Sequence, residues 1–158
     1  MQSYMFDTNV FNCILDGKIE ICEFRARAIF YATHIQLDEL TATSNIPRRQ
    51  ELLAVFKSIV ERHQIPTDSF FLGVSQLGEA KLGDKENDLC LKIKEELDKR
   101  NKNKRNNIQD SLIAETAAKN GLSLITHDAD LFFVATKFGA ACGNVHQMIR
   151  ELKGDEEG

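Results

Sequence analysis

Two short apolar segments near opposite ends of the chain each run into acidic residues. Residues 4–6 are followed directly by Asp7, and residues 122–126 are followed two positions later by Asp128. Both segments have the composition of β-strands. In an open parallel sheet the carboxyl ends of the strands face one crevice, so acids at those ends can converge although they are far apart in sequence. The chain is therefore expected to fold around such a sheet.

Four acidic residues are candidates for this convergence. Asp7 and Asp128 follow the two apolar segments, Glu39 lies in the first turn of an expected helix, and Asp110 lies in the first turn of another. Carboxylates that are crowded together repel one another, and the usual remedy is a hard divalent cation with oxygen ligands. The four residues are thus a candidate Mg²⁺ or Mn²⁺ site.

Each of these acids also has a simpler explanation. Asp7, Asp128 and Asp130 stand at or near the start of expected helices and could act as N-caps, a common role of aspartate. Asp110 and Glu39, each in the first turn of an expected helix, could interact favourably with the helix dipole. Capping accounts for any one residue taken alone, and it accounts less well for the combination.

The composition limits the chain to a few classes of protein. A length of 158 residues with 42% hydrophobic content suits one domain with a core, and the net charge of −4 means that any nucleic-acid binding must be local. The four cysteines form no CxxC pair, which argues against a zinc ribbon. No apolar stretch is long enough to cross a bilayer and no signal peptide is evident, so we expect a cytoplasmic protein without membrane contact.

Hydrophobic periodicity predicts alternating helices and strands, which is typical of an α/β fold with a parallel sheet covered on both faces. One domain is expected over residues 1–153, with a charged helical stretch at about 79–107 and a frayed acidic tail at 154–158. The apolar stripe Leu89, Ile93 and Leu97 of that stretch could face a partner, although burial against the core explains it better. Strands are expected at 4–6, 32–35 and 122–126, with a β-compatible run or buried helical turn at 69–75, and helices at 9–15, 18–31, 36–41, from Pro47 onward, 108–120, 131–138 and 145–152.

Three segments of the chain resemble the signature segments of PIN-domain nucleases. They are residues 5–10, 108–114 and 124–131, and the similarity is greatest to the VapC-type ribonuclease toxins of toxin-antitoxin systems. The resemblance implies a PIN-like three-layer α/β/α sandwich with a central, mainly parallel sheet. It also implies a metal-dependent endoribonuclease that uses one or two Mg²⁺ or Mn²⁺ ions, an antitoxin partner and a homodimer.

The resemblance assigns roles to individual residues. The acidic quartet would be Asp7, Glu39, Asp110 and Asp128, with Asp130 as an accessory ligand, and Glu39 is preferred to Asp38 because it directly precedes an apolar residue. Thr8, Asn9 and Thr126 would orient carboxylates or a metal-bound water. The charged stretch is longer than its equivalent in compact members of the family, and His127 stands where an arginine is common.

Basic residues that could hold RNA lie in two groups. Arg48 and Arg49 begin one expected helix, while Lys102, Lys104 and Arg105 lie in an expected loop, although charge runs are more often solvated surfaces. The sequence leaves two other functions open: a catalytically inactive PIN-like interaction module, and a PIN-type nuclease acting on DNA. The preference for RNA comes from the resemblance alone.

Overall fold

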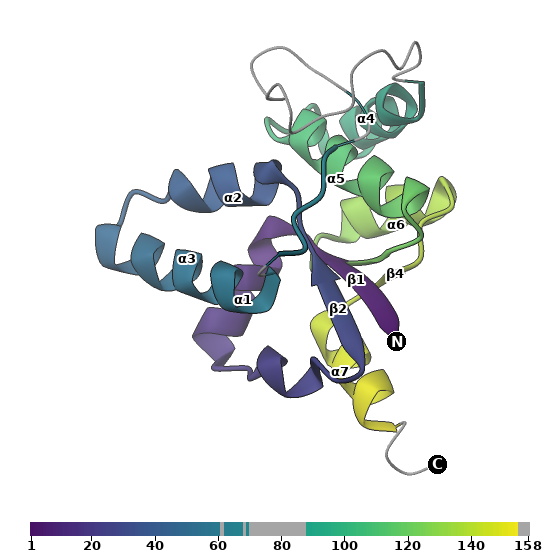
Figure 1. Ribbon diagram of the computed structural model, residues 1–158. Coiled ribbons are helices and arrows are strands. Elements are labelled where there is room, and N and C mark those ends of the chain that lie inside the picture. The colour runs from purple at the N-terminus through teal and green to yellow at the C-terminus, as the bar shows by residue number, and fades with distance from the viewer. Residues whose placement is uncertain (61, 68, 70–87, 155–158) are drawn as a thin grey trace.

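The computed structural model describes residues 1–60, 62–67, 69 and 88–154. Within them a parallel sheet of four strands forms the centre of the molecule, in the order β2-β1-β3-β4 (Figure 1). Its strands are β1 (Gln2–Phe6), β2 (Ala28–Tyr31), β3 (Ser123–Ile125) and β4 (Cys142–Gly143). The α/β class expected from the sequence is confirmed.

The central strand β1 sends alternate side chains to the two faces of the sheet. Tyr4 and Phe6 enter one hydrophobic cluster, and Met5 enters the other. The neighbouring strand β3 repeats this alternation, because Ile125 lies with Phe6 and Leu124 lies with Met5. All five side chains are almost fully buried, as expected for strands that are covered on both faces.

Helices cover both faces of the sheet and make three layers (Figure 1). One face packs against α1 (Thr8–Gly17), α3 (Ile46–Val60) and α7 (Val145–Gly154), and the other against α4 (Asp88–Asn101), α5 (Asn107–Lys119) and α6 (Ala129–Lys137). The remaining helices are α2 (His34–Thr41), which contributes side chains to both clusters, and the 3₁₀ helix η1 (Ile21–Phe24). No helix in the described part of the chain combines the length and apolar character needed to cross a membrane.

The predicted helix at 18–31 is wrong. Only η1 is helical there, and β2 begins at Ala28, earlier than the strand expected at 32–35. Ala28 and Phe30 point into the core while Ile29 and Tyr31 are half-buried, which is the two-residue period of a strand. The ring of Phe30 packs against the rings of Tyr4 and Phe6 on β1, so contacts distant in sequence override the local helical pattern.

Residues 32–35 contain the start of a helix instead of a strand. Thr33 is the N-cap of α2 and forms a capping box with Gln36. Since α2 begins at His34, Glu39 lies beyond its first turn, and the expected helix-dipole role of Glu39 is also wrong. The two-residue strand β4 was not predicted at all.

Several other predicted elements are confirmed with small shifts of boundary. The helices expected at 9–15, 108–120, 131–138 and 145–152 correspond to α1, α5, α6 and α7, and Pro47 is the second residue of α3. Gly121 has the predicted left-handed conformation after α5. The expected run at 69–75 lies outside the described residues from residue 70 onward, as do 79–87 of the charged stretch and 155–158 of the tail. The described part of the charged stretch forms α4 and the loop at 102–106, and Ile93 and Leu97 of α4 are buried against the core.

Candidate active site

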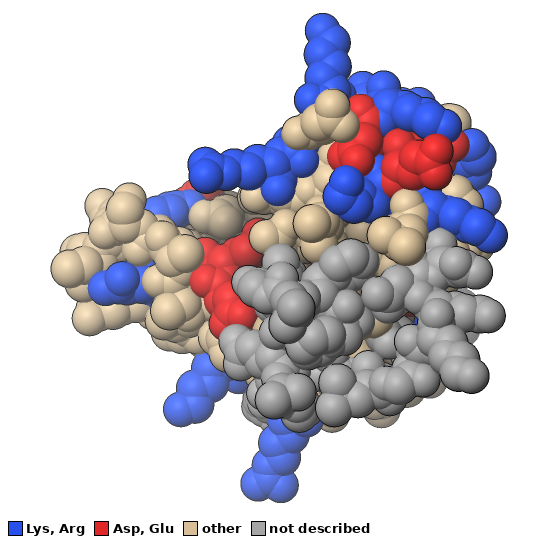
Figure 2. All heavy atoms as spheres, turned by 90° about the horizontal axis from the view of Figure 1, so that it is seen from above, with Lys and Arg blue, Asp and Glu red and all other residues tan. Residues whose placement is uncertain are grey.

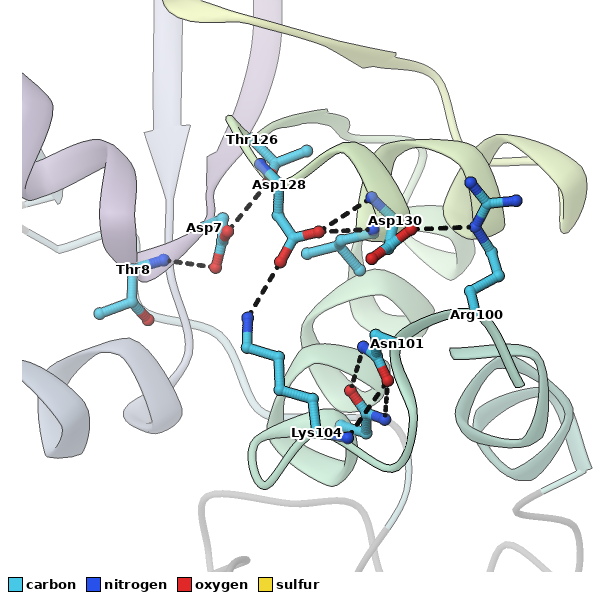
Figure 3. A network of polar contacts seen from close by, with 10 residues as sticks. Asp7, Thr8, Arg100, Asn101, Lys104, Thr126, Asp128 and Asp130 are labelled. Carbon is cyan, nitrogen blue, oxygen red and sulfur yellow. Dashed lines mark hydrogen bonds and ion pairs between the residues drawn. The ribbon is translucent and has the colours of Figure 1, made fainter. Parts of the chain in front are cut away.

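Asp7 lies at the carboxyl end of β1, in the middle of the sheet, and is 4% exposed. Its backbone N–H still donates to the carbonyl of Ile125, so the ladder between β1 and β3 continues to the start of α1. Its carboxylate accepts from the N–H of Thr8 at 2.7 Å and from the hydroxyl of Thr126 at 2.9 Å (Figure 3). Asp7 is therefore the N-cap of α1, and it also faces the end of β3. Burial is the main reason that the pKa of Asp7 is raised.

Glu39 reaches the same region from α2. The helix is tied to the end of β1 by Gln36, whose Nε2 donates to the carbonyl of Phe6 at 3.0 Å and whose Oε1 accepts from Thr33. Within the described residues, the buried atoms Glu39 Oε1 and Thr8 Oγ1 have no hydrogen-bond partner. The pKa of Glu39 is raised to about 7. Burial is the main cause, the charge of Asp7 acts in the same direction, and the nearby Thr8 hydroxyl acts against it, although the pair does not reach hydrogen-bond geometry.

Asp110 approaches from the first turn of α5 and is 8% exposed. The pKa of Asp110 is raised to about 8, mainly by burial and also by the neighbouring charges of Asp7 and Glu39. A buried carboxylate with this pKa is mostly protonated at neutral pH unless a cation stabilises the charged form. Asp7, Glu39 and Asp110 thus form one electrostatically coupled group at the carboxyl ends of β1 and β3.

Asp128 completes the group and differs from the other three. Its Oδ1 caps α6 by accepting from the N–H groups of Asp130 and Leu131, and its Oδ2 accepts from Lys104 Nζ at 3.1 Å (Figure 3). Burial opposes ionisation of Asp128, but the Leu131 N–H and the Lys104 ammonium outweigh it, so the pKa of Asp128 lies below its ordinary value. Asp128 is therefore charged at neutral pH.

Asp130 points away from this group. Its carboxylate pairs with Arg100 Nε of α4 at 3.2 Å, on the other side of Asp128 from Lys104 (Figure 3). The structure therefore does not bring the expected accessory ligand to the other acids. Viewed from the carboxyl ends of the strands, acidic atoms lie in a recess, with lysine and arginine atoms around the same end of the molecule (Figure 2).

The remaining predicted residues divide between the site and other contacts. Thr8 and Thr126 contact Asp7, whereas Asn9 is exposed on α1 and makes no hydrogen bond to any of the four acids. Arg48 pairs with Asp16 at 2.8 Å and bonds Asn12, so it joins α3 to α1. Arg49, Lys102 and Arg105 form no hydrogen bond or ion pair with the four acids, unlike Lys104.

Two residues of the site were not recognised as such from the sequence. Lys104 was predicted only as an RNA contact, and Gln36 was not singled out. The signal for Gln36 was present, because Thr33 and Gln36 have the spacing of a capping box. Lys104 gave no such signal, since it reaches Asp128 only because Lys102 and Asn103 adopt left-handed conformations after α4.

The donor set suits a hard cation, although its side chains are not gathered around one point. Among the described residues, no three Asp, Glu, His or Cys side chains are close enough to hold a metal ion as they stand. The four acids nevertheless supply only oxygen atoms, one of them buried and unpaired, and two of the acids have pKa values raised toward neutrality. These features fit Mg²⁺ or Mn²⁺, which favour carboxylate oxygens.

The comparisons with known proteins concern the fold. Neither a scan against protein-family models nor a search of curated proteins found a match for this sequence. Among solved structures, the chain matches one of VapBC2 from Rickettsia felis bound to a DNA fragment from their promoter, with 17% identity, a TM-score of 0.55, and coverage of 90% of this chain and 98% of the matched chain.

The chain has a VapC-type PIN fold. The three-layer sandwich with a parallel sheet expected from the signature segments is therefore confirmed. A second similar structure is that of VapBC-5 from Mycobacterium tuberculosis, a member of the VapBC family of toxin-antitoxin systems, with 23% identity, a TM-score of 0.47, and coverage of 92% and 98% of the two chains. In this PIN fold the four acids come from β1, α2, α5 and the loop before α6.

Proposed function

We propose that this protein is a cytoplasmic, Mg²⁺- or Mn²⁺-dependent endoribonuclease and the toxin of a toxin-antitoxin pair. The observation that carries the proposal is the coupled group of Asp7, Glu39, Asp110 and Asp128 at the carboxyl edge of a PIN-fold sheet. The proposal that an antitoxin binds the chain rests on the likeness to VapBC2 and on the signature segments, and the proposal that two copies form a homodimer rests on the signature segments alone.

When bound, one or two divalent ions would neutralise the carboxylates, polarise a phosphate and supply an activated water. Asp7, Glu39 and Asp110 are the residues that would hold them, with Asp128 as a fourth ligand. The protein orients these groups in advance: the N–H of Thr8 and the hydroxyl of Thr126 hold Asp7, and Gln36 anchors α2 beneath Glu39.

Lys104 supplies a fixed positive charge at the same place. Its pKa is raised, mainly by its hydrogen bond to Asp128, so the ammonium keeps its proton. With side-chain exposure near one half, Lys104 can also contact the phosphate of a bound strand. His127, which directly precedes Asp128, is not paired with a nucleophilic side chain in the described residues. No covalent step is therefore proposed.

The first test replaces Asp110 with asparagine, which keeps the shape of the side chain and removes its charge. We expect Asp110→Asn to lower the rate of metal-dependent RNA cleavage at least about a hundredfold, because one of the central oxygen ligands loses its charge. The assay follows cleavage of a structured RNA with Mn²⁺, and circular dichroism checks that the variant is folded. Asp38→Asn, an exposed acid on α2, is the matched control.

Three results would contradict the proposal. Full activity in Asp110→Asn would show that Asp110 is not a required metal ligand. Absence of cleavage in wild-type protein with Mg²⁺ or Mn²⁺, on both RNA and DNA, favours an interaction module with a PIN fold, and cleavage of DNA alone identifies a DNA nuclease.

A further inference from the structure

A pocket of about 700 Å³ opens beside the acidic group, along the exposed side of α6. Thr126 and Asp128 form part of its wall, so the pocket is continuous with the candidate active site. Its size lies within the range of small-molecule and nucleotide sites, which is roughly 300 to 1,000 Å³. None of the roles assigned to the four acids accounts for this space.

The pocket is lined by two aromatic side chains that the core does not use. Phe132 and Phe133 follow one another on α6 and are 37% and 51% exposed, whereas the aromatic rings of Phe6, Phe11 and Phe30 are buried. Exposed rings beside a polar site provide flat apolar surfaces on which a planar group can stack.

The polar groups of the pocket favour an anionic, base-containing ligand. Arg100 lies 4.0 Å above the ring of Phe133 and is held there by Asp130. Lys137 stands on the same wall, paired with Glu96. The lining therefore contains two cations and the single carboxylate of Asp128, although the chain as a whole is acidic. Asn144 also lines the pocket; its Oδ1 caps α7, which leaves its amide nitrogen able to donate to the edge of a base.

We propose that this pocket binds an unstacked nucleobase of single-stranded RNA, next to the phosphodiester that the acidic group cleaves; the proposal rests on the function proposed above. Phe132 is the stacking platform, because Arg100 already covers one face of Phe133. Arg100 and Lys137 hold the adjoining phosphates. Duplex RNA buries its bases, so this site selects strands whose bases can be splayed out and stacked on an aromatic ring.

Binding is tested without cleavage, in EDTA, with a short single-stranded oligoribonucleotide that contains 2-aminopurine. Stacking on Phe132 quenches 2-aminopurine fluorescence, so wild-type protein gives a saturable decrease. We expect Phe132→Leu to bind roughly fivefold or more weakly and to lose the quench, since leucine keeps apolar area but offers no ring. Phe132→Trp retains both RNA binding and the fluorescence quench. Leu91→Ala, which alters an exposed apolar residue of α4 outside the pocket, leaves both unchanged.

The outcomes separate this inference from the proposed function. Quenching that depends on Phe132, in a protein that never cleaves RNA, supports base binding in the pocket and refutes the proposed nuclease activity. If the protein cleaves RNA with metal, and wild type and Phe132→Leu bind RNA and quench fluorescence equally, base binding in the pocket is refuted and the nuclease proposal stands. A change of oligomeric state in Phe132→Leu, measured by light scattering and without loss of RNA binding, identifies this wall as a protein interface and overturns the inference.

Discussion

At the scale of single residues, Lys104 combines a role predicted from the sequence with a contact that only the structure shows. It is predicted to contact RNA, and its ammonium lies 3.1 Å from Asp128 within the acidic group. A positive charge at this position opposes the binding of any other cation. We expect Lys104→Met to bind Mn²⁺ roughly two- to fivefold more tightly than wild type, as measured by isothermal titration calorimetry.

The control for this prediction comes from the same loop. Lys102 is exposed and forms no hydrogen bond or ion pair with the four acids, so Lys102→Met should leave Mn²⁺ affinity within error of wild type. Equal affinities in the Lys104→Met variant and wild type would mean that the Lys104–Asp128 pair does not compete with metal. Weaker binding would mean that Lys104 helps to organise the ligands.

At the scale of elements, the junction between β1 and α2 depends on one buried amide. Gln36 accepts from both the N–H and the hydroxyl of Thr33 and donates to the carbonyl of Phe6. Gln36→Leu removes these three buried hydrogen bonds, and we expect it to lower the free energy of unfolding by about 2 to 3 kcal/mol in urea titrations. Gln50→Leu, an exposed position of α3, should change it by less than about 0.5 kcal/mol. A loss at Gln36 no larger than at Gln50 would refute the role of this junction.

The same elements show how far the sequence could predict the fold. The central strands and α5 were predictable, because a continuous apolar run and the stop at Gly121 are local signals. The region of η1 and β2 was not, because Phe30 becomes part of a strand through rings that come from β1. Likewise, the four acids could be identified from local motifs. Lys104 reaches them through the left-handed conformations of Lys102 and Asn103, which no sequence motif predicts.

At the scale of the whole molecule, the acidic group couples stability to pH. In the metal-free protein the pKa of Glu39 is about 7 and that of Asp110 about 8, whereas both titrate near their ordinary values of 4.5 and 3.8 when unfolded. Between these limits the native state binds more protons than the unfolded state. The free energy of unfolding must therefore fall as pH rises from about 5 to about 8.

We expect this fall to be on the order of 1 kcal/mol per pH unit, and urea titrations in EDTA at several pH values measure it. Asp110→Asn cannot titrate at this position and relieves Glu39 of a neighbouring charge, so its stability should vary less with pH over the same range. Saturating Mn²⁺ should flatten the wild-type profile in the same way, because a bound cation keeps the carboxylates ionised in the native state. A wild-type profile that rises from pH 5 to 8 in EDTA would contradict the electrostatic coupling on which the proposed site rests.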